Sequence, residues 1–469
     1  MRKERDSLGE MDVPDDAYYG VQSVRARDNF PVTGLRVSPY LIRAYGLVKR
    51  ACAEVNIEEG VLDKAKGAAI VKAAQELVDG KFHEHVIVDV FQAGAGTSTN
   101  MNVNEILANR ALEMLGNKKG EYETVSPNDH VNRGQSTNDT YPTVLNLSIL
   151  LALDDVEKST QVLIRSLRKK EAEFADVAKS GRTHLKDAMP VTLGEEFGAY
   201  ASALERVLEG LPQVRKGLGE VALGGSAVGT GVNTFPGYRE KSVARLAKVS
   251  GHAVTVSRDP FETMQSRWAP LAASSLLRSL AVELSRVSND LRLLSSGPGS
   301  GLDELRLPEV QAGSSIMPAK VNPSMAECLN QICYHIIGSD TATMMAAEAG
   351  QMEINVMMPV MSFEVLFSAT MLVNFLPVFA RKAVDGITAN RERCETYLLA
   401  STSLATILTP KLGYLKVAEA IKKSMAKGES VKSYLVREKL LTEAEAEELL
   451  GRTALLKLTK PVVASAGKK

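Results

Sequence analysis

The sequence predicts a mainly α-helical fold built around a bundle of long helices. Between about residues 140 and 390, apolar runs of roughly 25–35 residues alternate with short loops. With a rise of about 1.5 Å per residue, each run would form a helix of roughly 40–50 Å. Ala, Leu, Val and Met supply the core, and aromatic residues make up only 5% of the chain, which suits closely packed helices. Helices that are apolar on all sides indicate a bundle that also packs against other chains.

The composition argues against several classes of protein. Lys and Arg total 56, as do Asp and Glu, so no global basic field recruits nucleic acid or an anionic membrane. The first residues lead into no apolar run, and we expect neither a signal peptide nor a membrane-spanning stretch. The four cysteines show neither CxxC spacing nor disulfide density, which favours a reducing, cytoplasmic setting. No motif for a redox cofactor is present. His83 and His85 do not share a helix face, which argues against a metal site there.

The N-terminal region contains two polar stretches between its expected elements. Residues 7–37 carry Pro and Gly punctuation and are expected to be extended or turns, and residues 38–80 are expected to be helical. Residues 92–104 combine two glycines with dense hydroxyls and amides, but no Gly-Lys-Ser/Thr follows, which excludes a phosphate loop. Residues 126–139 are rich in Ser, Asn and Asp. Taken alone, the first stretch is best explained as a turn that caps the next helix, and capping is also an alternative for the second.

The central runs are expected to be helices, and the first of them is too apolar for a helix with one solvent-facing side. That run, Val144–Leu153, predicts a helix buried on most sides. The other runs cover roughly residues 154–178, 192–222, 262–296, 323–348 and 358–389.

A loop over residues 313–323 precedes one of these helices. Pro323 is well placed for a first helical turn, so a helix is expected to start there. Polar side chains at Ser314, Ser315, Lys320 and Asn322 would lie near the helix N-terminus, where partial positive charge favours anions. The loop is therefore a candidate for holding a carboxylate, and a polar loop that only packs is an equally weighted alternative.

These stretches together resemble the fumarase/aspartase superfamily, whose members eliminate a group from a succinyl-type substrate to give fumarate. Residues 313–322 resemble its signature loop, residues 92–104 and 126–139 its first two motifs, and residues 181–184 its Gly-Arg-Thr-His loop. A glycine-rich segment, residues 224–237, also matches. The resemblance spans nearly the whole chain and implies three domains, residues 1–135, 136–390 and 391–469. It also implies a homotetramer with active sites shared between subunits, and no cofactor.

The resemblance also implies roles for individual residues. Ser314 would be the base that takes a proton from the substrate Cβ, giving an aci-carboxylate intermediate, and Gly313 would be a hinge for loop closure. His184 would be the second catalytic residue, as an acid or as a group that orients an ammonium. The residues expected to bind the dicarboxylate substrate are Thr97, Ser136, Thr137, Asn138, Thr183, Met317, Lys320 and Asn322.

The forms of the motifs favour the aspartase branch of the superfamily. Ser136-Thr137-Asn138 and Ala319 match that branch, whereas fumarases more often carry Ser-Ser-Asn. A class II-type fumarase is the alternative, because His184 is able to protonate a leaving hydroxide. A structural or binding role is a weaker alternative, since Ser314 and Lys320 are both present. Gly134, Met358 and Thr409 depart from the family forms.

The last part of the chain, residues 391–469, is expected to be a small helical domain. Thr442 and Glu445 have the spacing of a capping box, with Leu441 as its hydrophobic staple. The end of the chain, from about Lys460, is expected to fray.

Overall fold

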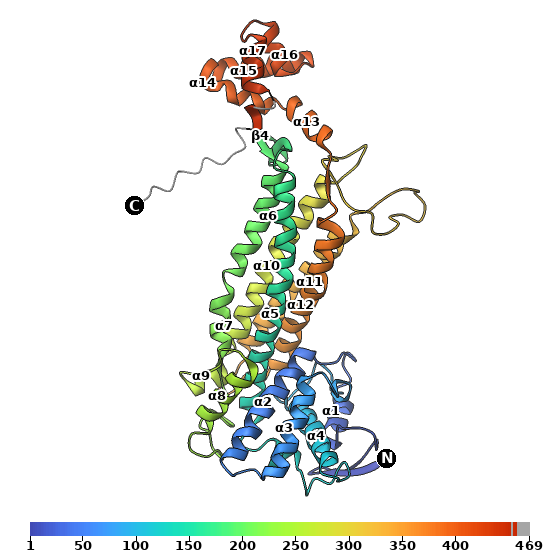
Figure 1. Ribbon diagram of the computed structural model, residues 1–469, viewed down its shortest axis with the longest axis vertical. Helices are drawn as coiled ribbons and strands as arrows, with labels where there is room; N and C mark the ends of the chain where they lie inside the picture. The colour runs from blue at the N-terminus through green and yellow to red at the C-terminus, as the bar shows by residue number, and fades with distance from the viewer. Residues whose placement is uncertain (452–453, 457–469) are drawn as a thin grey trace. The chain divides into compact units, whose positions relative to one another are not determined.

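The computed structural model describes residues 1–451 and 454–456 and has the predicted mainly α-helical fold (Figure 1). The end from Lys460, expected to fray, lies outside the described residues. The packing divides the chain into two compact units. The first unit comprises residues 1–158, 207–282 and 332–373, and the second comprises residues 159–206, 283–331 and 374–469. The three-domain division expected from the sequence stays a prediction.

Four long helices contribute residues to both units. They are α5 (Thr137–Glu173), α10 (Trp268–Leu294), α11 (Ser324–Glu348) and α12 (Met358–Phe379). The helix α5 joins two runs that the sequence analysis separates, and it continues through Pro142. The expected run over residues 192–222 is instead two helices, α6 (Leu193–Leu208) and α7 (Leu211–Gly219), which break at Gly210.

The first unit contains most of the shorter helices of the N-terminal half. They are α1 (Val21–Asn29), α2 (Pro39–Glu58), α3 (Lys64–Val78), α4 (Thr97–Met114), α8 (Tyr238–Ser250) and α9 (Pro260–Gln265), with a π-helix over Pro127–Val131. Strands β1 (Arg2–Asp6) and β2 (Gly9–Val13) pair antiparallel, and β5 (Glu220–Val221) and β6 (Thr255–Val256) pair parallel.

The second unit contains two antiparallel strand pairs and the C-terminal helices. Strand β3 (Ala178–Thr183) pairs with β4 (Lys186–Thr192), and β7 (Leu305–Arg306) pairs with β8 (Thr388–Ala389). A π-helix over Ala380–Val384 extends α12. The helices that follow are α13 (Arg391–Ala400), a 3-10 helix over Thr402–Leu408, α14 (Thr409–Leu412), α15 (Tyr414–Lys427), α16 (Val431–Arg437) and α17 (Glu443–Leu450).

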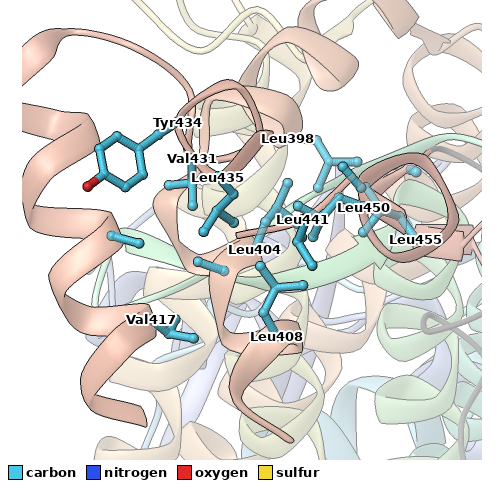
Figure 2. Packing of buried hydrophobic residues seen from close by; sticks show 14 residues of the cluster. Leu398, Leu404, Leu408, Val417, Val431, Tyr434, Leu435, Leu441, Leu450 and Leu455 are labelled. Atoms are coloured by element: carbon cyan, nitrogen blue, oxygen red, sulfur yellow. The ribbon is translucent and has the colours of Figure 1, made fainter. Parts of the chain in front are cut away.

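The C-terminal helices have a hydrophobic cluster of their own (Figure 2). Leucines from α13, the 3-10 helix, α16 and α17 meet in it, including Leu398, Leu404, Leu435 and Leu450. The predicted capping box is confirmed, because Thr442 Oγ1 accepts the Glu445 amide and the Glu445 carboxylate accepts the Thr442 amide. Leu441 is buried in the same cluster, which is consistent with its predicted packing at the start of α17.

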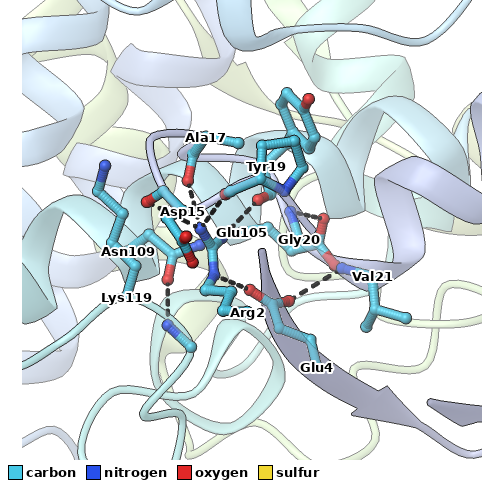
Figure 3. Close-up of polar contacts among 12 residues, drawn as sticks. Arg2, Glu4, Asp15, Ala17, Tyr19, Gly20, Val21, Glu105, Asn109 and Lys119 are labelled. Atoms are coloured by element: carbon cyan, nitrogen blue, oxygen red, sulfur yellow. Dashed lines mark hydrogen bonds and ion pairs between the residues drawn. The ribbon is translucent and has the colours of Figure 1, made fainter. Parts of the chain in front are cut away.

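Helix α1 lies where the sequence analysis expects only extended and turn structure, so that expectation is wrong for Val21–Asn29. The reason is that distant carboxylates cap the helix (Figure 3). Glu4 accepts the Val21 amide, and Glu105 of α4 accepts the amides of Gly20 and Gln22. Three amides at the start of this helix have no acceptor within the helix. They donate instead to carboxylates that lie far away in the sequence.

Helix α12 is more apolar than the sequence analysis expects. Together with its π-helical extension, over Met358–Val384, it is long and apolar enough to cross a membrane by length and composition, contrary to the expectation of no such stretch. In its most apolar window, 44% of the residues are buried within the chain. A core helix of a soluble protein meets the same criteria.

Candidate active site

The first predicted stretch forms a tight turn at the start of α4. Gly94, Ala95 and Gly96 all have positive φ, and Thr97 is the first residue of the helix. Gly96 has no room for a side chain, since a Cβ there would lie 1.9 Å from the Tyr141 ring. The backbone at Gly96 therefore packs directly against the Tyr141 ring. The Thr97 side chain is exposed, and its hydroxyl donates to the Gly94 carbonyl at 2.7 Å.

The second stretch caps α5, as the capping alternative predicts. Ser136 Oγ accepts the Asn138 amide at 3.2 Å, and Asp139 Oδ1 accepts the Ser136 amide at 2.9 Å. Thr137 Oγ1 accepts from the Asn100 side chain at 3.2 Å, and the Asn138 side chain donates to the Ala227 carbonyl. Asn100 belongs to α4, so the structure brings the first two stretches together.

Asp139 ties the glycine-rich segment to the same place. Its Oδ2 accepts the amides of Gly224 and Ser226 at 3.0 and 2.9 Å. The carboxyl is fully buried, and this burial raises its pKa to about 6 although these hydrogen bonds oppose the rise. One buried carboxyl thus fixes both the start of α5 and the turn at residues 224–226.

A buried lysine holds the second stretch in place through hydrogen bonds. Lys49 of α2 is fully buried, and its Nζ donates to Asn132 Oδ1 and Gln135 Oε1, each at 2.9 Å. Burial lowers the pKa of Lys49 to about 7. Asn132 Oδ1 also accepts from the side chains of Asn100 and Asn104. The loop that leads into Ser136 is therefore held by a buried polar network.

A cavity of about 570 Å³ in the first unit is lined in part by Thr97 and Ser98. Arg5, Arg25 and Ser126 are among its other lining residues. Ser136, Thr137 and Asn138 are not among them. Of the predicted substrate-binding residues in this unit, only Thr97 lines this cavity.

In the second unit, the predicted Thr183 and His184 lie at the tip of the β3–β4 hairpin. Thr183 pairs with Lys186, so His184 and Leu185 are the two turn residues, and both have a φ of 56°. Both predicted side chains are exposed. A two-residue turn with two positive φ values normally carries Asn-Gly, so a His-Leu turn stores backbone strain.

The predicted signature loop carries its functional side chains in an irregular segment before α11. Ser314 Oγ accepts the amides of Ile316 and Met317 at 3.2 and 2.9 Å. The Asn322 side chain donates to the Gly313 carbonyl. Met317 and Lys320 are exposed. The helix begins at Ser324, directly after Pro323, as predicted.

Close packing within the loop requires a glycine at position 313, in addition to its predicted role as a hinge. A Cβ there would lie 2.1 Å from the Lys320 carbonyl oxygen and 2.8 Å from the Asn322 amide nitrogen. The two ends of the loop therefore touch, and only glycine permits this approach. Ala319 completes the loop with a φ of 63°, a costly conformation for a residue with a Cβ.

Comparisons with known proteins cover almost the whole chain. A lyase family model matches residues 9–338, and a model of the fumarase C C-terminus matches residues 404–457. The aspartate ammonia-lyase of a Bacillus species is 44% identical over 450 residues, which are 96% of each chain. That of Pseudomonas aeruginosa is 45% identical over 452 residues, 96% of this chain and 95% of that one.

The chain belongs to the fumarase/aspartase superfamily. With aspartate ammonia-lyases as relatives along nearly its full length, it is a carbon–nitrogen lyase.

Solved structures of the superfamily share the fold. A fumarate lyase:delta crystallin from Brucella melitensis bound to cobalt has a TM-score of 0.94 and 44% identity, with 98% of this chain and 100% of that chain covered. A class II fumarase from Schistosoma mansoni has a TM-score of 0.93 and 34% identity with the same coverage. In this chain, the described residues contain no group of three or more His, Cys, Asp or Glu placed to hold a metal ion.

Two residues that support the candidate site are not predicted from the sequence. Lys49 lies in the expected helix over residues 38–80 directly before Arg50, so the sequence alone does not mark it as the buried cation. Asp139 lies in the second stretch, and its role depends on the distant amides of Gly224 and Ser226. The partners of both residues lie far away in the sequence, so no local pattern names them.

Proposed function

We propose that this superfamily member eliminates ammonia from L-aspartate to give fumarate, reversibly. The observation that carries the proposal is the 42–45% identity to relatives named aspartate ammonia-lyase over nearly the full length, against 34% to the class II fumarase. The Ser136-Thr137-Asn138 form of the second stretch supports the same choice.

The chemistry requires a base beside a set of donors. In the elimination, a base takes a proton from the substrate Cβ, the adjacent carboxylate accepts the electron pair as an aci-carboxylate, and the Cα–N bond then breaks to release ammonia. The ammonium is already protonated before it leaves, so the site needs positioning more than it needs an acid. The intermediate carries extra negative charge, which preorganised donors stabilise.

Ser314 is the proposed base, and its surroundings support that role. A serine is a poor base unless its oxyanion is stabilised. The amides of Ile316 and Met317 already donate to Ser314 Oγ, and these contacts would strengthen as the oxygen becomes negative. His184 is proposed to orient the ammonium, at the exposed tip of its hairpin.

The remaining predicted residues are proposed to bind the two carboxylates. Ser136 Oγ and Thr137 Oγ1 act as acceptors towards neighbouring groups, and each hydroxyl keeps its single hydrogen for donation to a carboxylate. Thr97, in the same unit, is proposed to add a third hydroxyl. In the second unit, Lys320 is proposed to hold the other carboxylate through its charge, and Asn322, Thr183 and Met317 are proposed to contribute to the same binding.

The geometry of one chain supports active sites shared between subunits. Thr137 and Glu173 are the two ends of α5, whose 37 residues rise about 54 Å. His184 follows Glu173 by eleven positions, which span at most about 40 Å when fully extended. Thr137 and His184 thus flank the opposite ends of one long helix in the sequence. We propose that neighbouring copies complete each site.

A homotetramer is the proposed assembly, and the exposed apolar surface of the long helices supports association. Helix α12 is strongly apolar and only partly buried within the chain. In the first unit, large apolar side chains of α10, α11 and α12 are exposed, among them Tyr334, Met344 and Met345 at 57%, 52% and 65%. Large exposed apolar side chains on several long helices favour a contact with another chain.

An assay with two substrates tests the proposed reaction. Purified protein is incubated with L-aspartate and, separately, with L-malate, while the absorbance of fumarate is followed. We expect kcat/KM for deamination of L-aspartate to be at least about tenfold to a hundredfold higher than that for malate dehydration. This ratio corresponds to the loss of one hydrogen bond to a charged group when malate replaces aspartate. Faster malate dehydration would replace the proposal with the class II-type fumarase reaction.

A further inference from the structure

A buried network of ion pairs lies in the second unit, outside the residues with predicted roles. Glu304 is fully buried, and its carboxylate contacts two cations. Arg182 binds it with both terminal nitrogens, at 3.0 and 2.8 Å, and Lys179 Nζ lies 2.8 Å from Oε2. Lys179 is also buried and pairs with Glu196 at 2.7 Å. The network therefore balances two positive charges with two negative charges in the interior.

The network joins two segments that carry predicted active-site residues. Arg182 lies in β3 and directly precedes Thr183 and His184, whereas Glu304 directly precedes β7, which leads into the loop of Ser314. The backbone of Glu304 is fixed as well, because its amide donates to the Leu294 carbonyl and its carbonyl accepts the Asn390 amide, both at 2.9 Å. Glu304 is thus a rigid point to which the hairpin is attached.

The hairpin needs such an attachment. Its two turn residues have positive φ without being glycine, and the strand register shifts between Ser180 and Arg182. Strained turns persist only where the surrounding structure holds them. Besides the strand pairing, the Arg182 contacts with Glu304 hold one strand close to the tip, and Ser403 Oγ donates to the Asp187 carbonyl on the other strand.

We propose that Glu304 is a positioning residue: by holding Arg182 in a two-point ion pair, it fixes the hairpin tip that presents Thr183 and His184 relative to the start of the Ser314 loop. This inference rests on the proposed function for its catalytic consequence. Its structural part, the attachment of the tip through Glu304, is independent of the substrate.

The hold on Arg182 requires the negative charge of Glu304, and a neutral side chain of the same shape is insufficient. Replacing the carboxylate with an amide keeps the size but leaves Arg182 and Lys179 without their buried counter-charge, which is strongly unfavourable. An amide also offers only one oxygen to the two guanidinium donors. Glu304→Gln should therefore release the tip, whereas Glu304→Asp keeps the charge and should restore part of the attachment.

The test combines hydrogen exchange with steady-state kinetics on the purified, assembled protein. The variants are Glu304→Gln and Glu304→Asp, and Glu309→Gln is the control, because Glu309 is an exposed glutamate five residues further along the same segment. Amide exchange is followed in peptides that cover residues 178–192 and 307–323, and kcat and KM are measured with L-aspartate.

We expect exchange in residues 178–192 to rise about tenfold or more in Glu304→Gln, and kcat to fall about tenfold to a hundredfold because a small misplacement of reacting groups is costly. Glu304→Asp should lie between this variant and the wild type, and Glu309→Gln should match the wild type. A purely structural role would lower the unfolding temperature while leaving kcat and tip exchange in the folded protein unchanged.

Unchanged tip exchange in folded Glu304→Gln would overturn the inference, whatever its activity. If that variant fails to fold, Arg182→Lys decides the question, since it keeps the positive charge but loses the two-point contact. Like Glu304→Gln, the Arg182→Lys variant should raise amide exchange at the hairpin tip and lower kcat. Wild-type values for both would refute the proposal. Absence of any wild-type activity on L-aspartate would refute the proposed function, while the exchange data would still decide the attachment.

Discussion

Replacing Gly96 with alanine should damage both the stability and the activity of the enzyme. Gly96 has a φ of 88° and precedes Thr97 at the start of α4. A Cβ at this position would lie 1.9 and 2.2 Å from two atoms of the Tyr141 ring. The ring is buried, and its hydroxyl is hydrogen-bonded to Ser362 at 3.0 Å. The ring therefore has no free space to move into.

The expected cost has two parts. A residue with a Cβ in the left-handed region costs about 1–2 kcal/mol. Forcing an extra carbon into a packed core costs typically about 1–3 kcal/mol. The Gly96→Ala variant should thus lose about 2–5 kcal/mol of unfolding free energy. Relief of the clash must move either Tyr141 or the turn that carries Thr97, and we expect kcat/KM for L-aspartate to fall about tenfold to a hundredfold.

Gly116→Ala is the matched control, because Gly116 follows the other end of α4 with a φ of 80° and no atom within 4 Å of the built Cβ. It should lose only the backbone part, about 1–2 kcal/mol, and keep wild-type kinetics. Denaturant unfolding and steady-state assays of both variants measure these differences. Equal destabilisation by the two substitutions would refute the close contact between Gly96 and Tyr141.

Three further substitutions have distinct expected outcomes. Ser314→Ala should lower kcat by about 10²–10⁴, the usual contribution of a general base, with a similar KM; steady-state kinetics that keep the wild-type kcat would contradict that role. Lys320→Ala should raise KM for L-aspartate about tenfold to a hundredfold through loss of a charged contact, and an unchanged KM would exclude that contact. The pKa of Lys49 is about 7 in the folded protein and 10.5 in the unfolded chain. Between these pH values the unfolded chain binds more protons than the folded protein, so the contribution of Lys49 to the free energy of unfolding rises with pH. Unfolding midpoints of Lys49→Met across this range should lack that rise, and a rise as large as in the wild type would show that another group causes it.

Local sequence patterns predict the elements that local interactions determine. The start of α11 after Pro323 and the Thr442–Glu445 capping box follow from residues within one helical turn. The capping role of residues 136–139 is equally local. In each case, the donors and acceptors that satisfy the helix end lie a few positions apart, so the sequence contains the whole interaction.

Elements that depend on distant partners could not be predicted in this way. Helix α1 is capped by Glu105, more than 80 positions away, and Glu304 binds Arg182 across a separation of 122 positions. The sequence predicts a hinge at Gly313, whereas the close approach of Gly313 to the Lys320 carbonyl exists only in the folded loop. Motif resemblance predicts the residues of the candidate site, whereas the supporting contacts of Lys49 and Glu304 arise only in the folded chain.

Mixing two inactive variants tests most directly whether separate stretches of several copies form one lyase site. Thr137→Val and His184→Ala subunits are each purified, partly dissociated, mixed in equal amounts and reassembled, and deamination of L-aspartate is measured. Because each proposed site takes Thr137 and His184 from different copies, random mixing should give about one quarter of the sites both native groups, and activity should recover towards about one quarter of the wild type. Confirmed hybrids with no recovered activity would contradict the shared site.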